Sequence, residues 1–297
     1  MRVLISGASG LVGTELRAQL AAAGHEPVSL VRRPAFGPNE IEWHPEHGFI
    51  AEGALDDIDA VVNLGGATTG KLPWTRNYKK LLVSSRLDST RTLVEAIKQA
   101  KKKPKVFISG SASGFYGDTG DQTLDETAPK GTGFLSDLAA EWETEALKAE
   151  PSTRVVLVRT TMVMSQKLGA LGRLLPLLKL GIGGPLGPGN QWWAWISLRD
   201  EARAIIHLIN NSNARGAFNL TAPEPATCAD IVKALAAGLR RPAILPVPSF
   251  ALKLAFGEGA QELLLCSQKM TADRLLASGF EFEHPTLKSS VDYVLGR

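Results

Sequence analysis

Apolar and polar positions alternate in two distinct ways along the first 165 residues. Short apolar runs predict strands at residues 3–5, 27–31, 60–64, 106–108 and 155–158. Between them, apolar residues recur with helical spacing over residues 14–23, 81–100 and 138–149. Strands that alternate with helices indicate a parallel sheet covered on both faces. The pattern therefore predicts an α/β fold built on a Rossmann-type doubly wound parallel sheet.

Three glycines spaced three apart follow the first predicted strand directly, in the segment GASGLVG from Gly7 to Gly13. Gly7 permits a tight turn, Gly10 lets the backbone approach a ligand, and Gly13 lets helix and strand pack closely. Unpaired N–H groups and a helix N-terminus then meet at one point, which suits a pyrophosphate. The alternative is a purely structural turn, but the position between a strand and a helix favours nucleotide binding.

The segments after the other predicted strands have a similar character. Each consists of small residues or carries arginine, and ligands of parallel sheets bind beyond the carboxyl ends of the strands. This agreement supports a ligand site at that edge. The segments are Val31-Arg32-Arg33, Leu64-Gly65-Gly66, Ser109-Gly110-Ser111 and Arg159-Thr160-Thr161.

The periodicity changes after about residue 165. Residues 181–189 are mostly glycine and proline, which predicts a loop, and a tryptophan-rich segment follows at residues 191–200. Residues 226–297 carry two or three amphipathic helices and a proline-rich link at 242–248. We expect residues 1–165 to form the dinucleotide-binding domain, completed by about residues 195–225. Residues 166–194 and 226–297 are expected to form a smaller α/β substrate lobe.

Charge and composition exclude several classes of partner. The net charge of +3 is too small to indicate nucleic acid or an anionic membrane. The lysine run at residues 101–103 is interpreted as a solvated helix end. The apolar stretch at residues 168–186 contains Arg173, Pro176 and Lys179, so it is a poor membrane span. No signal peptide is visible at the start of the chain.

The cysteines and histidines give no sign of a metal site. Cys228 and Cys266 lack metal-ligand spacing, and the five histidines are scattered. We expect both cysteines to be buried free thiols, which is consistent with a reducing compartment and a cytoplasmic location.

The end of the second predicted strand indicates the type of dinucleotide. A site that prefers NAD usually carries an acidic residue there, to bind the ribose hydroxyls. Residues 29–33 read SLVRR, without an acid. A guanidinium suits a 2′-phosphate, so the sequence favours NADP(H), with Arg32 as the main contact. The alternative is an exposed basic pair before Pro34.

The motifs taken together resemble the extended short-chain dehydrogenase/reductases. Beside the glycine turn they are Asn63-Leu-Gly-Gly66, Ser109-Gly-Ser-Ala-Ser-Gly-Phe-Tyr-Gly117 and Trp195-Ile-Ser-Leu-Arg-Asp200. Trp74-Thr75, Ser85-Arg86, Trp142-Glu143 and the glycines before Pro185 are similar to the atypical "epimerase family" branch. Members of that branch are often labelled nucleotide-sugar epimerases or cell-division inhibitor homologues. The resemblance covers nearly the whole chain.

This resemblance implies a Rossmann domain that binds NADP(H) and a small C-terminal substrate lobe. It places the pyrophosphate on the glycine turn, the adenosine on the ends of the next strands, and the nicotinamide near Val163. Arg86 is expected to reach in from its helix, with a surface salt bridge as the alternative, and plain core is the alternative for Val163. The implied cofactor residues are Gly7, Ser9, Gly10, Leu11, Val12, Gly13, Val31, Arg32, Leu64, Gly65, Arg86, Ser109 and Val163.

The chain departs from the family at its acid/base pair. The family uses Tyr-x-x-x-Lys, in which the tyrosine exchanges the proton and the lysine lowers its pKa. The corresponding segment, residues 131–141, reads GTGFLSDLAAE, without tyrosine or lysine. Phe134 has no proton to donate, and Asp137 has the wrong charge for the lysine role.

Other groups near this segment are candidates for chemistry. Ser111 and Tyr116 are possible catalytic participants; the alternatives are a turn or cofactor contact for Ser111 and a packed, hydrogen-bonded phenol for Tyr116. A substrate pocket walled by Trp192, Trp193 and Trp195 is a further hypothesis, against core or interface packing. Asp200 is expected to cap a helix that begins near residue 201.

Two functions remain open from the sequence. The first is an NADP(H)-dependent oxidoreductase or epimerase-like enzyme that transfers hydride at a carbonyl or carbinol carbon of a small molecule, with a nucleotide sugar as the family expectation. The second is a non-catalytic NADPH-binding regulatory protein, linked to cell division, which the missing pair favours. A monomer and a homodimer are both compatible with the sequence.

Overall fold

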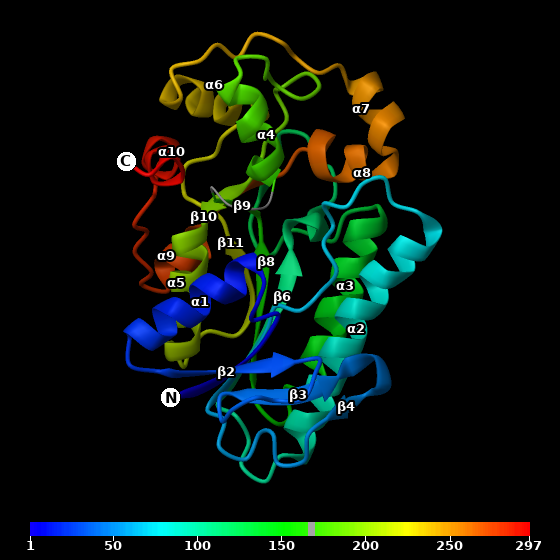
Figure 1. Cartoon of the computed structure of the whole chain (residues 1–297), viewed down its shortest axis with the longest axis vertical. Helices are drawn as coiled ribbons and strands as arrows, with labels where there is room; N and C mark the ends of the chain where they lie inside the picture. Colours follow the sequence, from blue (N-terminus) through cyan, green and yellow to red (C-terminus); the bar gives the residue numbers. More distant parts are fainter. Residues whose placement is uncertain (166–169) are drawn as a thin grey trace.

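An eight-stranded sheet forms the centre of the larger part of the molecule (Figure 1). The computed structural model describes residues 1–165 and 170–297. All neighbouring strands are parallel except β3 and β4, which are antiparallel. In spatial order the strands are β11 (Gly216–Leu220), β8 (Arg154–Thr160), β6 (Val106–Ala112), β5 (Ala60–Asn63), β1 (Arg2–Ser6), β2 (Glu26–Val31), β3 (Glu40–His44) and β4 (Phe49–Ile50).

The order in which the chain adds strands to the sheet reverses between β1 and β5, although these two strands are parallel. From β1 the chain proceeds outward to β2 and β3, and it then returns to the other side of β1 for β5, β6, β8 and β11. Ligands of doubly wound sheets bind beyond the carboxyl ends of the strands at such a switch point. The predicted Rossmann-type α/β fold is therefore confirmed, and the glycine turn after β1 lies at the switch.

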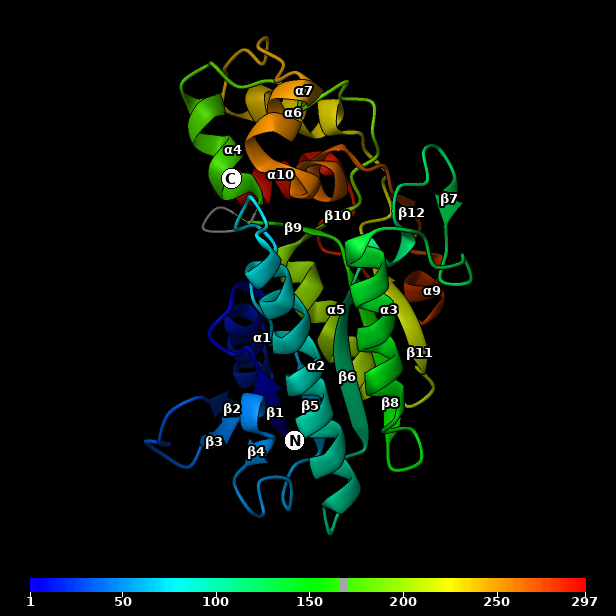
Figure 2. The same cartoon turned by 90° about the vertical axis from the view of Figure 1, so that its right-hand side faces the viewer.

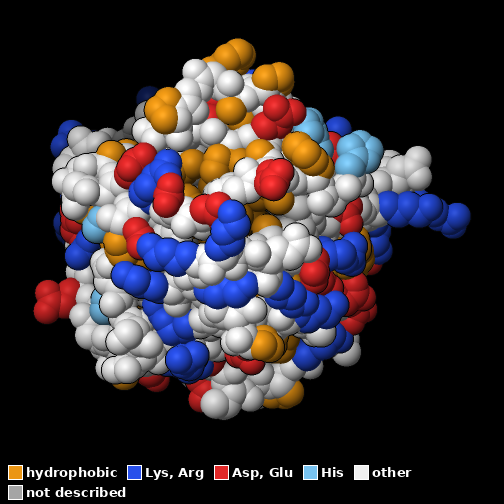
Figure 3. Space-filling view, turned by 90° about the horizontal axis from the view of Figure 1, so that it is seen from below, with side chains coloured by type: hydrophobic (Ala, Val, Ile, Leu, Met, Phe, Trp, Pro, Cys, Tyr) orange, Lys and Arg blue, Asp and Glu red, His pale blue; other side chains and the backbone are white. Residues whose placement is uncertain are grey.

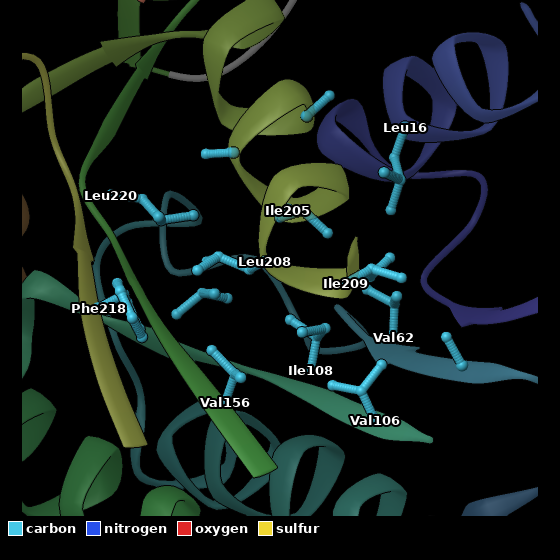
Figure 4. Close-up of a cluster of buried hydrophobic side chains, with 14 of the residues drawn as sticks. Leu16, Val62, Val106, Ile108, Val156, Ile205, Leu208, Ile209, Phe218 and Leu220 are labelled. Atoms are coloured by element: carbon cyan, nitrogen blue, oxygen red, sulfur yellow. The ribbon is translucent and has the colours of Figure 1, made fainter. Parts of the chain in front are cut away.

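Helices cover both faces of this sheet (Figure 2). α1 (Leu11–Ala22) and α5 (Leu198–Asn210) pack together on one face, and α2 (Arg76–Gln99) and α3 (Phe134–Leu147) pack on the other. Because successive strand side chains point to opposite faces, Val3 and Ile5 join the first core while Leu4 joins the second. Figure 4 shows the first core, in which Ile205, Leu208 and Ile209 lie over the sheet.

A second group of helices lies beyond the carboxyl edge of the sheet. It consists of α4 (Ala170–Lys179), α6 (Cys228–Gly238), α7 (Ser249–Phe256), α8 (Glu258–Ala260), the π-helical turn η3 (Gln261–Leu265) and α10 (Leu287–Leu295). The short sheet of β9 (Met162–Met164) and β10 (Trp195–Ser197) connects it to the Rossmann part. α4, α6 and α10 share a separate hydrophobic core with Trp195.

The remaining elements are short. They are the 3₁₀ turns η1 (Pro45–His47) and η2 (Ser113–Tyr116), the strand pair β7 (Thr123–Leu124) and β12 (Lys269–Met270), and helix α9 (Asp273–Ala277). Leu275 of α9 and the following Phe280 pack in the sheet-side core, although they fall in the range expected for the lobe. The expected lobe segment at residues 166–194 includes residues 166–169, which lie outside the described residues.

The predicted strands and helices are present, with ends that differ by a few residues. Within the eight-stranded sheet, β3, β4 and β11 were not predicted, because β3 alternates charged and apolar residues in only five positions and the others are short or glycine-led. The short strands β7, β9, β10 and β12 were not predicted either. The expectation for Asp200 is wrong. Ser197 is the N-cap of α5, and Asp200 lies one turn inside, where its backbone N–H donates to the Ser197 hydroxyl.

The surface and the thiols agree with the predictions from composition. The lysine run at residues 101–103 is exposed after the end of α2, and Figure 3 shows Lys and Arg spread with Asp and Glu over the face seen from below. Cys228 and Cys266 are buried free thiols. Among the described residues, no helix is long and apolar enough to cross a bilayer, and no cluster of side chains is suited to hold a metal ion.

Candidate functional site

The turn after β1 accepts only glycine at its two ends. Gly7 has a φ of +68°, and a Cβ there would lie 2.8 Å from the backbone carbonyl carbon of Leu64. A Cβ on Gly13 would lie 2.2 Å from the carbonyl oxygen of Gly7. The turn closes with a 2.9 Å hydrogen bond from Gly10 N–H to that same oxygen. The three glycines therefore bring β1, the end of β5 and α1 into direct backbone contact.

The N-terminus of α1 is open to an anion. Its N-cap is Gly10, which supplies no side-chain cap, and its first turn contains no acidic residue. Ser9 and Gly10 are exposed beside it. Free backbone N–H groups at the positive end of a helix dipole suit a phosphate, so this cradle fits the pyrophosphate of a dinucleotide.

A chain of buried hydrogen bonds fixes the neighbouring strand end. The Ser6 hydroxyl donates to Asn63 Oδ1 over 2.5 Å and accepts from Gly65 N–H over 3.0 Å. Asn63 Nδ2 and the Trp142 indole both donate to the Thr90 hydroxyl, at 2.9 and 2.8 Å. These bonds join β1, β5, α2 and α3, so the segment after Leu64 is held rigidly beside the glycine turn.

Arg32 and Arg33 differ sharply in their surroundings, although they are adjacent at the end of β2. Arg33 forms two 2.7 Å hydrogen bonds with Glu40, and its guanidinium lies 4.3 Å from the Phe36 ring centroid. Arg32 is exposed and has no ion-pair or hydrogen-bond partner within residues 1–165 and 170–297. Of these two arginines, only Arg32 is therefore free to meet a phosphate.

Arg86 holds the loop after β5 in place. Its guanidinium donates to the carbonyl oxygens of Ala67 (3.1 Å) and Leu82 (3.0 Å), and it lies 5.3 Å from the Trp142 ring. Burial lowers the pKa of Arg86 to about 10. No ion pair forms to Arg86 in the part of the chain that the structure describes, so the surface salt bridge considered from the sequence is absent.

Ser111 and Tyr116 belong to one buried polar network. The Ser111 hydroxyl donates to Glu143 over 2.6 Å, and Arg159 forms a two-point ion pair with Glu143. Arg159 also donates to the Tyr116 hydroxyl (2.8 Å), which itself donates to Asn219 Oδ1 (2.7 Å). Because Tyr116 has 0% exposure and its hydroxyl is satisfied, this arrangement favours the packed phenol over a proton donor to substrate.

The segment expected to carry the acid/base pair forms the start of α3. Asp137 is exposed and forms a 2.6 Å ion pair with Lys130. Four residues before it, at the spacing of Tyr-x-x-x-Lys, stands Gly133, the N-cap of α3, with a φ of +112°. The helix has no side-chain cap of its own. Instead, Glu262 of the C-terminal lobe accepts hydrogen bonds from the N–H groups of Phe134 (2.8 Å) and Leu135 (2.7 Å).

The three tryptophans do not line one surface. Trp195 is buried in the lobe core, with 1% exposure, whereas Trp192 and Trp193 are partly exposed. The indole of Trp192 donates to Asp121 over 2.8 Å, and that of Trp193 donates to the Leu264 carbonyl over 3.1 Å. At most Trp192 and Trp193 can face a ligand.

Two further residues of the predicted cofactor site are covered. Ser109 is fully buried within β6, and its hydroxyl contacts the Gly110 carbonyl at 3.3 Å. Val163 lies in β9, is partly buried and packs against the core on the α5 face. Val163 therefore lies near the carboxyl edge of the sheet, whereas Ser109 is buried within β6.

Sequence reasoning missed two carboxylates that the fold brings to this edge. Glu262 is one, and Glu201 of α5 is the other. Glu201 is fully buried, accepts a 2.7 Å hydrogen bond from Thr160, and has its second oxygen unpartnered. Burial raises the pKa of Glu201 to about 8. The position of neither could be read from local sequence, because each meets partners more than 40 residues away.

Comparison with known proteins agrees with this geometry. The model of the NAD dependent epimerase/dehydratase family matches residues 3–221, and a domain of unknown function, DUF1731, matches residues 247–293. An epimerase family protein of Mycobacterium leprae is 40% identical over 296 residues, covering 99% of this chain and 96% of the relative. The human epimerase family protein SDR39U1 is 34% identical over 298 residues, covering 99% and 100%.

Solved structures give the same result. The crystal structure of human SDR39U1 (isoform2) with NADPH has a TM-score of 0.93 at 34% identity, covering 100% of this chain and 99% of the other. A nucleoside-diphosphate sugar epimerase from Corynebacterium glutamicum has a TM-score of 0.83 at 30% identity, and the match covers 58% of its chain. The glycine turn, the switch point and these matches together show that the chain belongs to the NAD dependent epimerase/dehydratase family, in its atypical short-chain dehydrogenase/reductase branch.

Proposed function

We propose that this protein is an NADP(H)-dependent oxidoreductase or epimerase-like enzyme that transfers hydride at a carbonyl or carbinol carbon of a small molecule. The observation that carries the cofactor assignment is the free Arg32 at the end of β2, beside the open glycine cradle. A nicotinamide cofactor, when bound, supplies the hydride chemistry. The NADPH in the human SDR39U1 structure supports the same choice.

Different residues at the carboxyl edge of the sheet bind different parts of the cofactor. Backbone N–H groups of the first turn of α1, from Leu11 to Gly13, hold the pyrophosphate, and Arg32 pairs with the 2′-phosphate. Val31, Leu64 and Gly65 border the adenosine, and Arg86 holds their loop in shape. Val163 borders the nicotinamide end. We place the small-molecule substrate between this edge and the C-terminal lobe, with Trp192 and Trp193 as its contacts.

The substrate class that we favour is a nucleotide sugar. It is supported by the structural similarity to the nucleoside-diphosphate sugar epimerase of Corynebacterium glutamicum, which is 30% identical. We further propose that the protein works in the reducing cytoplasm, because both of its thiols are buried and unpaired. As its state of assembly we propose a monomer or a homodimer.

A non-catalytic NADPH-binding regulator is the second candidate. The observations that favour it are the absence of tyrosine and lysine at residues 131–141 and the burial of Tyr116. Such a protein would use NADPH as a structural or redox-sensing ligand. It binds the cofactor as the enzyme does, so only turnover separates the two candidates.

The first test is a fluorescence titration with NADPH and NADH of the wild type, Arg32→Ala and Arg33→Ala. Loss of the phosphate contact should raise the NADPH dissociation constant about tenfold to a hundredfold, with little change for NADH. Arg33→Ala is the matched control and should bind as the wild type does, because Glu40 occupies Arg33. Equal binding of NADPH by wild type and Arg32→Ala would refute the phosphate assignment.

The second test measures turnover. NADPH oxidation is followed with a panel of aldehydes, ketones, quinones and keto-sugar nucleotides, and NADP⁺ reduction with the matching alcohols. Steady turnover with one substrate supports the enzyme. Tight NADPH binding without turnover across the panel rejects it in favour of the regulator.

A further inference from the structure

We propose that Glu262 is the acid/base residue of this site, supplied by the C-terminal lobe in place of the missing tyrosine. The inference rests on the proposed function, since it concerns the proton that accompanies hydride transfer. In this role Glu262 is a catalytic residue, and it also caps the N-terminus of α3.

The carboxylate occupies the space that a side chain at position 133 would need. A Cβ on Gly133 would lie 2.9 Å from Glu262 Oε1 and 3.2 Å from its Cδ. Gly133 also stands four residues before Asp137, which is the spacing between the tyrosine and lysine of the usual pair. A side chain at 133 would therefore require the Glu262 carboxylate to move from its present position, and the chain has glycine there.

The fold presents this carboxylate at the ligand edge of the sheet. The start of α3 packs against η2, which follows β6, since a Cβ on Gly114 would lie 3.0 Å from Leu135. On its other side Phe134 meets Trp74, from the loop after β5, with ring centroids 5.6 Å apart. Gly133 is exposed and Glu262 is partly exposed. The carboxylate therefore lies beside the segments that follow β5 and β6, at the edge of the sheet where we place the ligand.

The segment that carries Glu262 is itself unusual. Glu262 lies in the π-helical turn η3, and single π turns occur frequently at functional sites. The preceding Glu258 is anchored to Lys79 of α2 at 2.7 Å. Gly259 packs against the loop before α2, because a Cβ there would meet Leu72 at 2.2 Å. The lobe therefore holds Glu262 in one position on α3.

The other candidate groups nearby are already occupied. Tyr116 has no exposure, and Ser111 donates to Glu143, whose charge Arg159 neutralises. Asp137 is paired with Lys130. Glu262 differs from these, because its partners are two backbone N–H groups and no cation pairs with it among the described residues.

The proposed step balances in protons and electrons. In alcohol oxidation, the substrate O–H bond breaks and its proton passes to Glu262. The C–H bond breaks at the same carbon, its hydrogen leaves with the electron pair to NADP⁺, and a C=O bond forms. The alcohol is oxidised and NADP⁺ is reduced to NADPH. In the reverse direction the protonated Glu262 returns its proton to the carbonyl oxygen and then regains one from water.

The experiment uses Glu262→Gln, Glu262→Asp and a matched control, Glu224→Gln. Glu224 also caps a helix with its carboxylate, by accepting from Leu287 N–H over 2.6 Å, but that helix is α10 and not α3. For each protein we would measure the NADPH dissociation constant, the thermal unfolding midpoint, and kcat against pH with the best substrate of the panel above.

The expected result is a kcat of Glu262→Gln lower by about 10²–10⁴-fold, with NADPH affinity unchanged. Its pH profile should lose the acid limb of the wild type, while Glu262→Asp keeps that limb at reduced rate. Glu224→Gln should lose stability alone. If Glu262→Gln does not fold, the Glu262→Asp profile decides the question.

Two results would overturn the inference, and they differ in what they imply for the proposed enzyme function. Wild-type turnover with equal kcat and pH profile in Glu262→Gln would show that Glu262 is only a helix cap and would leave the proposed enzyme intact. The absence of wild-type turnover despite NADPH binding would reject the proposed enzyme and the acid/base role together.

Discussion

Arg159 and Glu143 form a two-point ion pair in the interior, with Nε 2.8 Å from Oε1 and Nη2 3.0 Å from Oε2. Both side chains are almost fully buried, at 5% and 8% exposure. Burial opposes the charge of Arg159, but its bonds to Glu143 outweigh that effect and raise the pKa of Arg159. The pair joins β8 to α3 and orients Ser111 and Tyr116 around it, so it is the centre of the network beneath the site.

Removal of one partner of this pair should be strongly destabilising. Arg159→Met leaves the Glu143 carboxylate buried without its cation, which typically costs about 3–5 kcal/mol in the free energy of unfolding. Urea unfolding measures this loss in the free energy of unfolding. Arg199→Met is the control, because Arg199 pairs with Glu283 on the surface at 2.7 Å and should change stability by less than about 1 kcal/mol. Similar losses in both variants would contradict the role of burial.

The glycine turn should not tolerate even one methyl group at position 13. In Gly13→Ala the new Cβ meets the carbonyl oxygen of Gly7 at 2.2 Å, so α1 must move away from the turn. We expect a loss of about 1–3 kcal/mol in unfolding free energy and the loss of measurable NADPH binding. Gly37→Ala, with no atom within 4 Å of its Cβ, should change neither. Intact NADPH affinity in Gly13→Ala would argue against the cradle.

Glu201 should make the stability of the protein fall as the pH rises. Burial raises its pKa from 4.5 to about 8, so between these values the folded state keeps a proton that the unfolded state has lost. Folding then takes up a proton, and stability falls by up to about 1.4 kcal/mol per pH unit in this window and levels off above pH 8. Below pH 4.5 Glu201 is protonated in both the folded and the unfolded protein, so its titration no longer changes the free energy of unfolding.

Glu201→Gln removes this titration and keeps an acceptor for Thr160. Its stability relative to wild type should therefore increase from about pH 5 to pH 8, as measured by urea unfolding at several pH values. The exposed Glu95→Gln is the control, and it should follow the wild-type pH dependence. A constant difference between Glu201→Gln and wild type across this range would refute a protonated Glu201.

Both thiols should be unreactive in the folded protein. Burial raises the pKa of Cys228 to about 11 and that of Cys266 to about 12, so little thiolate exists at neutral pH. A colorimetric disulfide reagent should modify them on the order of a hundredfold more slowly in the native protein than in urea. Fast release of one equivalent from native protein would mean that one thiol is accessible.

The sequence by itself determined the first unit of the fold and the choice of its ligand. β1, the glycine turn and α1 are specified locally, because the spacing of Gly7, Gly10 and Gly13 requires one backbone path between a strand and a helix. The alternation of the later strands and helices determined the α/β class for the same reason. The basic end of β2 indicated NADP(H), and the structure added only that Glu40 occupies Arg33 and leaves Arg32 free.

Only the tertiary structure decided what the candidate catalytic residues do. Tyr116 is buried because Asn219 and Arg159 reach it from β11 and β8, 103 and 43 positions later in the chain. Glu262 meets the start of α3 across 128 positions. Hydrogen bonds of this separation leave no periodic or spacing signal in the sequence, since they depend on how two lobes and several strands pack. Local patterns therefore specified the glycine turn, and long-range packing specified the surroundings of Tyr116 and Glu262.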